Sequence, residues 1–170
     1  MKKSFIIIGI VIALFAVRFV YEVKKSPRVK IFFYVEDYPV AMGMHVSDVD
    51  SYYFNIEESG ESASSRASLY GFKGTLMLTF NDQGFVDHIV FITNEKLYAS
   101  DKRIVELVEG IGEFYDKEMK YAMGGYYIVS KDKTTAASVV ASDGHLMLTI
   151  AAKGTRMHNN LLTLDERESK

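Results

Sequence analysis

The residues of this chain best suited to chemistry are its four histidines, because imidazole transfers protons near neutral pH and ligates metals. They are His45, His88, His145 and His158. The sequence has no HExxH, GxSxG, P-loop or dinucleotide-binding fingerprint, the spaced motifs that position catalytic groups. Zinc shared by His88, His145 and His158 is an alternative, although no carboxylate pattern accompanies them. We therefore expect a non-catalytic protein without cofactor or metal, and keep a histidine- or metal-dependent hydrolase as an alternative.

A second chemical candidate is the acidic pair in Ser47-Asp48-Val49-Asp50. Two carboxylates at this spacing could bind a cation. Alternating acidic residues before an apolar segment are more typical of helix caps and solvated charge. We therefore interpret this stretch as the start of a helical segment.

Composition narrows the class of partner. The chain has 170 residues, of which 48% are hydrophobic and 25% charged, and its net charge is −2. This charge provides no basic field for counterion release from a nucleic acid, so no nucleic-acid partner is expected. The absence of cysteine excludes disulfides, thiolate zinc sites, thiol catalysis and lipid attachment to cysteine.

The first 21 residues predict a membrane anchor. Two lysines precede a run from Phe5 to Val17 that is entirely apolar or glycine, and apolar residues continue to Tyr21. At about 1.5 Å per residue, the span from Phe5 to Tyr21 nearly crosses a hydrocarbon core of about 30 Å. Cleavage after Ala16 would place Leu14 where a signal peptidase prefers a small residue, which favours an uncleaved anchor. Residues 22–30 are charged, contain Pro27, and are predicted to form a juxtamembrane linker.

The orientation of this anchor has two interpretations. Five basic residues follow the apolar run within a short distance and only two precede it, which by the positive-inside rule favours a cytoplasmic body. The order of a charged start followed by an apolar run is instead typical of an export signal. We expect a single-pass protein of the cell membrane with an extracytoplasmic body, either periplasmic or at the cell surface.

The body alternates between two hydrophobic periodicities. The segment 101–119 has a helical apolar stripe behind the cap Asp101. Strands are predicted in ASLYGF, TLMLTF and FVDHIVFIT, and again in YYIVS, TTAASVVA, HLMLTIA and MHNNLLTL. The predicted turns are Lys73-Gly74, 81–84 and Asp143-Gly144, and the small polar residues 59–68 are interpreted as beginning in a mobile loop.

A similarity between two segments of the sequence suggests an internal duplication. When residues 67–93 are compared without gaps with residues 137–163, ten of the twenty-seven positions are identical. We therefore expect an α+β fold in which the anchor is followed by two repeated units, each a helix plus a three-stranded antiparallel meander, with the helices on one face of the sheet. The units are predicted at 31–95 and 96–165, and a tail at 166–170. Two unrelated hairpins of similar composition are the alternative.

Two motifs resemble a known family. GMHVSDVDSYYF (43–54) and LTFNDQGFVDHIVF (78–91) resemble the BamE family, the small lipoprotein subunit of the outer-membrane β-barrel assembly machine. Two such units in tandem resemble the β-lactamase inhibitor protein fold. The resemblance implies an extracytoplasmic, non-catalytic α+β module that binds another protein across its sheet. The chain lacks the lipidated cysteine of the lipoprotein family.

Strand alternation predicts a partner-binding face. With a four-residue turn at 81–84, one side of the sheet carries Leu76 and Leu78, and the other carries a mixture of apolar, threonine and histidine residues. We expect this second side to bind a partner, because methionine and histidine among β-branched residues suit a partly wet interface. Alternatively, it lies beneath the linker or an N-terminal strand. The predicted partner-binding residues are Met77, Val86, His88, Val90, His145, Met147 and His158.

The sequence thus favours a membrane-tethered, extracytoplasmic protein-binding module that docks an envelope protein through an open sheet face. An inhibitor or immunity protein against a secreted enzyme or toxin would share this fold and differ only in its partner.

Overall fold

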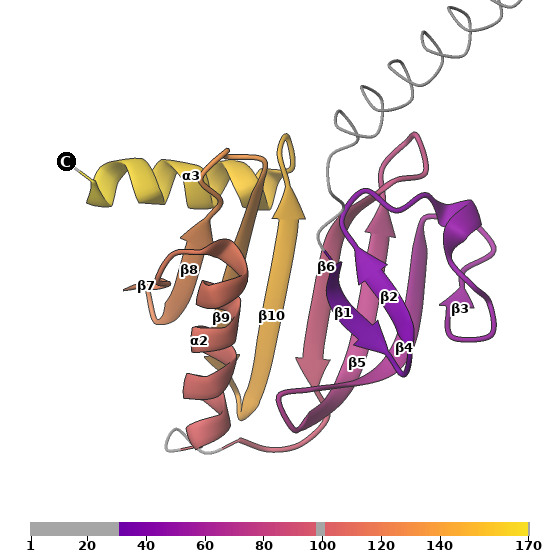
Figure 1. The fold of residues 1–170 in the computed structure, drawn as a ribbon, viewed down its shortest axis with the longest axis horizontal. Coiled ribbons are helices and arrows are strands. Elements are labelled where there is room, and N and C mark those ends of the chain that lie inside the picture. Colours follow the sequence, from indigo (N-terminus) through magenta and orange to yellow (C-terminus); the bar gives the residue numbers. More distant parts are fainter. Residues whose placement is uncertain (1–30, 98–100, 170) are drawn as a thin grey trace, which may run out of the picture. The chain divides into compact units, whose positions relative to one another are not determined.

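The computed structural model describes residues 31–97 and 101–169, whose main feature is an antiparallel sheet of eight strands. The strand order is β3-β4-β5-β6-β10-β9-β8-β7 (Figure 1). The strands are β3 (Asn55–Ile56), β4 (Ser62–Leu69), β5 (Phe72–Phe80), β6 (Val86–Thr93), β7 (Lys120–Ala122), β8 (Gly125–Val129), β9 (Thr135–Ser142) and β10 (His145–Ala152). Two meanders, β4–β6 and β8–β10, therefore join side by side through the pairing of β6 with β10.

Tight turns connect most neighbouring strands. In Tyr70-Gly71, Met123-Gly124 and Asp143-Gly144, both residues have positive φ. Two such residues form the type I′ turn, whose twist matches that of a two-residue β-hairpin. Each meander therefore contains one hairpin whose turn geometry favours the pairing of its two strands.

One face of the sheet carries the main core. A separate hairpin of β1 (Ile31–Val35) and β2 (Tyr38–Ala41) lies over the β4–β6 half, and helix α2 (Lys102–Tyr115) lies over the other half (Figure 1). The core includes Val35 of β1 and Leu107 of α2, packed in one cluster with side chains from both meanders. The side chains of Leu76, Leu78, Leu146 and Leu148 are completely buried here, as the alternation of the strands predicted.

Helix α2 confirms the helix predicted within 101–119. The Asp101 carboxylate accepts a hydrogen bond from the backbone N–H of Arg103 at 3.0 Å, which caps the first turn. The helix ends at Asp116, which has a left-handed conformation. Its inward stripe buries Leu107, Ile111 and Tyr115.

Helix α3 (Arg156–Glu168) packs on the opposite face of the sheet. The Thr155 side chain caps its N-terminus by accepting from the His158 N–H at 3.2 Å. Leu161 packs there against a second cluster, formed by Tyr127, Val129 and Ala136. The fold therefore places one helix on each face, whereas the sequence predicted both on one face.

The expected fold of two helix-plus-meander repeats is wrong. Residues 144–163 do not repeat the strand pair of residues 74–93, because their second half is the start of α3. Gly74 and Gly144, which the gapless comparison aligned with each other, also differ in structure. Gly144 lies in a turn, whereas Gly74 lies inside β5. A Cβ on Gly74 would lie 2.3 Å from the carbonyl oxygen of Ile92, so close packing of the strands requires glycine there.

Three local predictions are also corrected. The segment MHNNLLTL is helical in α3, which continues through most of the predicted tail at 166–170. The helix expected after Ser47 is only the short 3-10 helix η1 (Val46–Asp48). The loop expected in the first half of 59–68 is limited to 59–61, because strand β4 begins at Ser62. The predicted anchor (1–21) and linker (22–30) lie outside the described residues, and within the described ranges no helix is long and apolar enough to cross a membrane.

Two adjacent residues of β10 test the assignment of the faces. Replacing Leu148 by alanine is expected to lower the free energy of unfolding by about 2–5 kcal/mol, because it leaves a cavity in the core. Replacing Met147, which is 39% exposed, by alanine is expected to cost less than about 1 kcal/mol. Urea denaturation followed by circular dichroism measures both. Equal losses would contradict the assignment.

Candidate protein-binding face

The candidate site is the face of the sheet opposite the main core, which we call the outer face. The strand registers determine its members, since directly paired residues point to the same side. From β4 to β9 across the sheet they are Ser62, Ser64, Arg66 and Ser68; Lys73, Thr75, Met77 and Thr79; His88, Val90 and Ile92; His145, Met147, Thr149 and Ala151; and Ala136, Ser138, Val140 and Ser142.

A contiguous apolar stripe runs diagonally over this face. Met77 is paired with Val90, Ile92 is paired with Met147, and Met147 is paired in turn with Val140. Met77 is 40% exposed and Met147 is 39% exposed, while the three branched residues are half-buried. These five residues, which we call the apolar stripe, are thus partly open to solvent at the centre of the sheet. Contiguous apolar surface of this kind is typical of binding sites.

Two unpaired cations border the apolar stripe on the β4–β5 side. Arg66 is paired in register with Thr75, and Lys73 lies two residues before Thr75 on the same strand. Both side chains are exposed, and neither forms an ion pair with any other described residue. The cationic rim, as we call Arg66 and Lys73, gives this side of the outer face a positive charge.

Two of the predicted histidines lie at the margins of the apolar stripe. The Nδ1 atom of His88 lies 2.9 Å from a carboxylate oxygen of Asp87. The Nδ1 atom of His145 lies 2.9 Å from the carbonyl oxygen of Thr93. Five predicted partner-binding residues are therefore on the outer face: Met77, His88, Val90, His145 and Met147.

Val86 is not on this face. The structure pairs Phe80 with Val86 and Thr79 with His88, so Asp87 is an extra residue that shifts the register. This bulge turns Val86 to the core side, where it is only 2% exposed. The sequence prediction assumed a turn that was one residue shorter.

His158 is not on the open face either. It belongs to α3 and is 1% exposed. Its Nε2 atom lies 3.1 Å from the carbonyl oxygen of Lys133, in the loop between β8 and β9. This contact ties the start of α3 to the sheet, so His158 has a structural role.

Helix α3 covers the β8–β9 end of the outer face. Tyr127 is 2% exposed there, and its burial raises the pKa of its phenol. The Lys120 ammonium lies 2.8 Å from a carboxylate oxygen of Asp165 on the helix, and this contact raises the pKa of Lys120. The uncovered part of the outer face therefore borders a part that already holds a helix.

The histidines do not converge on a common centre. His88, His145 and His158 contact groups in separate parts of the fold. Among the residues that the structure describes, no group of three histidine or acidic side chains is placed to hold a metal ion. The zinc arrangement considered from the sequence is therefore not formed by these residues.

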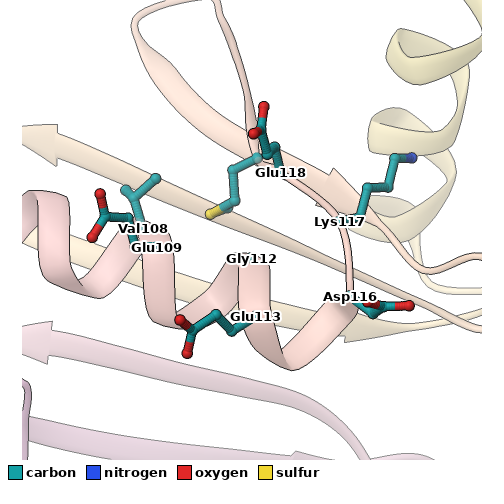
Figure 2. A pocket seen from close by; sticks show the side chains of 8 residues that line it. Val108, Glu109, Gly112, Glu113, Asp116, Lys117 and Glu118 are labelled. Atoms are coloured by element: carbon teal, nitrogen blue, oxygen red, sulfur yellow. The ribbon is translucent and has the colours of Figure 1, made fainter.

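A cavity of about 700 Å³ lies at the C-terminal end of α2. Its lining includes Glu109, Glu113, Asp116 and Glu118. Figure 2 shows these carboxylates pointing in different directions, with Lys117 directed away from Glu113. They do not form the paired acid and base that hydrolytic chemistry requires.

Sequence reasoning missed two parts of the outer face. Arg66 was missed because no strand was predicted before Ala67 in this serine-rich segment, whose first half was interpreted as a loop. Val140 was missed because β9 is apolar on both sides, which hides the alternation of its residues. The signal that could have identified Arg66 is the weak alternation of Ala63, Ala67 and Leu69, which all face the core.

No protein-family model, curated protein or solved structure matches this chain. The resemblance to the BamE family and to the β-lactamase inhibitor protein fold therefore stays a prediction.

Two histidines test the reassignment of His158. Replacing His158 by alanine is expected to lower the free energy of unfolding by about 2–4 kcal/mol, since it leaves a cavity and an unpaired carbonyl. Replacing the exposed His145 by alanine is expected to cost less than about 1 kcal/mol. Thermal and urea unfolding of both variants provide the measurement. A His158 variant that is stable but binds its partner poorly would contradict the structural role and support the original prediction that His158 contacts the partner.

Proposed function

We propose that this chain is a membrane-tethered, extracytoplasmic protein-binding module that docks another envelope protein through the outer face. The observation that carries the proposal is the apolar stripe, whose two methionines are 40% and 39% exposed. Methionine adapts its shape to a partner, and the flanking threonine, serine and histidine residues supply polar contacts of the kind found at an interface rim.

The tether rests on the composition of residues 1–21. The charged start followed by a long apolar run is the pattern of an uncleaved signal anchor. The position of the body outside the cytoplasm rests on this same pattern. A short anchored chain brings its binding face to other proteins of the envelope without any catalytic step.

The outer face is a better candidate than the α2 cavity for binding a protein. A protein interface needs a broad apolar centre with a polar rim. The outer face has this arrangement across four strands, whereas the α2 cavity is a local hollow bordered by acidic side chains.

Site-specific photo-crosslinking in intact cells tests the proposal. A photo-reactive amino acid replacing Thr75 is expected to capture an envelope protein, because Thr75 lies beside Met77 on the outer face. The same amino acid replacing Tyr121, which is 65% exposed on β7 and on the core side, serves as the control position. Mass spectrometry of the adduct identifies the partner and the side of the membrane.

Charged substitutions in the apolar stripe test whether the Thr75 adduct depends on the outer face. Changing Met77 and Met147 to glutamate is expected to reduce the Thr75 adduct at least about tenfold, since it places charges in the interface centre. The melting temperature should stay nearly unchanged, because both positions are partly exposed. Met123→Glu is the matched control, since Met123 is 93% exposed in the β7–β8 turn. Equal adduct yields from all variants would contradict the proposal.

A further inference from the structure

The outer face already binds one helix, and this interface shows which chemistry the sheet accepts. Helix α3 inserts Leu161 against Tyr127, Val129 and Ala136. Met157, Leu162 and Leu164 pack at the edges of the same cluster. The apolar side of an amphipathic helix thus fills one end of the face.

Ion pairs at its border hold α3 in place. Asp165 lies between Lys120, at 2.8 Å, and Lys117, at 3.8 Å. Glu166 lies 3.3 Å from Lys133. The helix contributes the carboxylates and the rest of the domain contributes the ammonium groups, so this interface combines an apolar centre with a cationic border.

The uncovered part of the outer face repeats this combination. Its centre is the apolar stripe, and its border is the cationic rim of Arg66 and Lys73, whose side-chain charges form no ion pair among the described residues. The Lys73 backbone N–H donates to a carboxylate oxygen of Glu95 at 3.2 Å, and that carboxylate is paired with Arg103. At the α3 interface, by contrast, Lys120 and Lys133 of the sheet and its loop are paired with the acidic residues Asp165 and Glu166 of the helix. The rim therefore lacks the acidic partners that the lysines beneath α3 already have.

The dimensions of this area also fit a helix. Neighbouring strands are about 4.8 Å apart, so the four strands that carry the apolar stripe, β5, β6, β10 and β9, span about 14 Å between the outer two. An α-helix with its side chains is about 10–12 Å across. One further helix is therefore wide enough to cover most of the apolar stripe.

We propose that the uncovered part of the outer face receives an amphipathic helix of the partner, beside α3, whose acidic side chains meet Arg66 and Lys73. This inference rests on the proposed function and specifies its partner. An extended segment would fit differently, because a β-strand pairs with the edge of a sheet and leaves the face uncovered. The continuity with α3 and the unneutralised rim both favour a helix.

Three synthetic peptides of about 15 residues test the proposal against the full chain in detergent micelles. The first is a hydrocarbon-stapled helix with an apolar stripe flanked by glutamates. The second is its twin with lysines in place of the glutamates. The third has the composition of the first, without the staple and with prolines that prevent a helix. Methionine methyl signals in ¹³C NMR provide the readout, with the remote Met123 as the internal reference.

The acidic helix is expected to shift the methyl signals of Met77 and Met147 and leave Met123 unchanged. It should bind at least about tenfold more tightly than its basic twin, because the rim is cationic. The double variant Arg66→Glu and Lys73→Glu is expected to reverse this order. Equal binding by the proline peptide, an unchanged order in the double variant, or unmoved Met77 and Met147 signals would overturn the helix proposal.

These outcomes are distinct from a failure of the proposed function. A Thr75 adduct in cells, together with failure of the stapled peptide, leaves the binding role standing and shows that the partner is not an acidic amphipathic helix. Loss of the Thr75 adduct contradicts the binding role and, with it, the inference about the helix.

Discussion

The pairing of β6 with β10 is the constraint on which the rest of the structure depends. It aligns Met147 with Ile92 and Leu148 with Phe91, and so joins two meanders that are separated in sequence by α2. Because paired residues share a side of the pleated sheet, this register puts the leucines of both meanders into one core and their methionines onto one outer surface. Neither meander alone would make a core or a face of this width.

The two faces are covered unequally. The β1–β2 hairpin and α2 both cover the core side, where Leu76, Phe91 and Leu148 are completely buried. On the outer side the structure has α3 at one end, and the apolar stripe stays partly exposed. A sheet with one fully packed face and one partly open face leaves apolar surface available to a partner.

The parts of the fold that could be predicted from sequence are those with a strong local pattern. Helix α2 and the inward position of Leu76 and Leu148 were predictable, because a capped stripe and a strict alternation each fix a period. The outward position of Met77 and Met147 followed from the same alternation. The type I′ turn at Tyr70-Gly71 was not recognised, since tyrosine rarely has positive φ.

The errors came from features that alternation does not encode. A single extra residue, Asp87, moved Val86 to the core, and nothing in the composition of the strand reveals that bulge. The segment MHNNLLTL in α3 was predicted as a strand, and the gapless comparison then aligned it with β6. His158 was consequently assigned to a docking face, although its position in α3 buries it against the loop after β8. The identities between residues 67–93 and 137–163 do not correspond to repeated structure.

Oxidative footprinting of methionines is the most direct test of the central claim that the outer face is a binding surface. Purified chain and membranes from cells that express it would be exposed to the same dose of hydroxyl radicals, and sulfoxide formation at each methionine would be measured by mass spectrometry. The account predicts that Met77 and Met147 are oxidised in the purified chain and protected in membranes, while Met123 reacts equally in both. Equal oxidation of Met77 and Met147 in the two samples would contradict it.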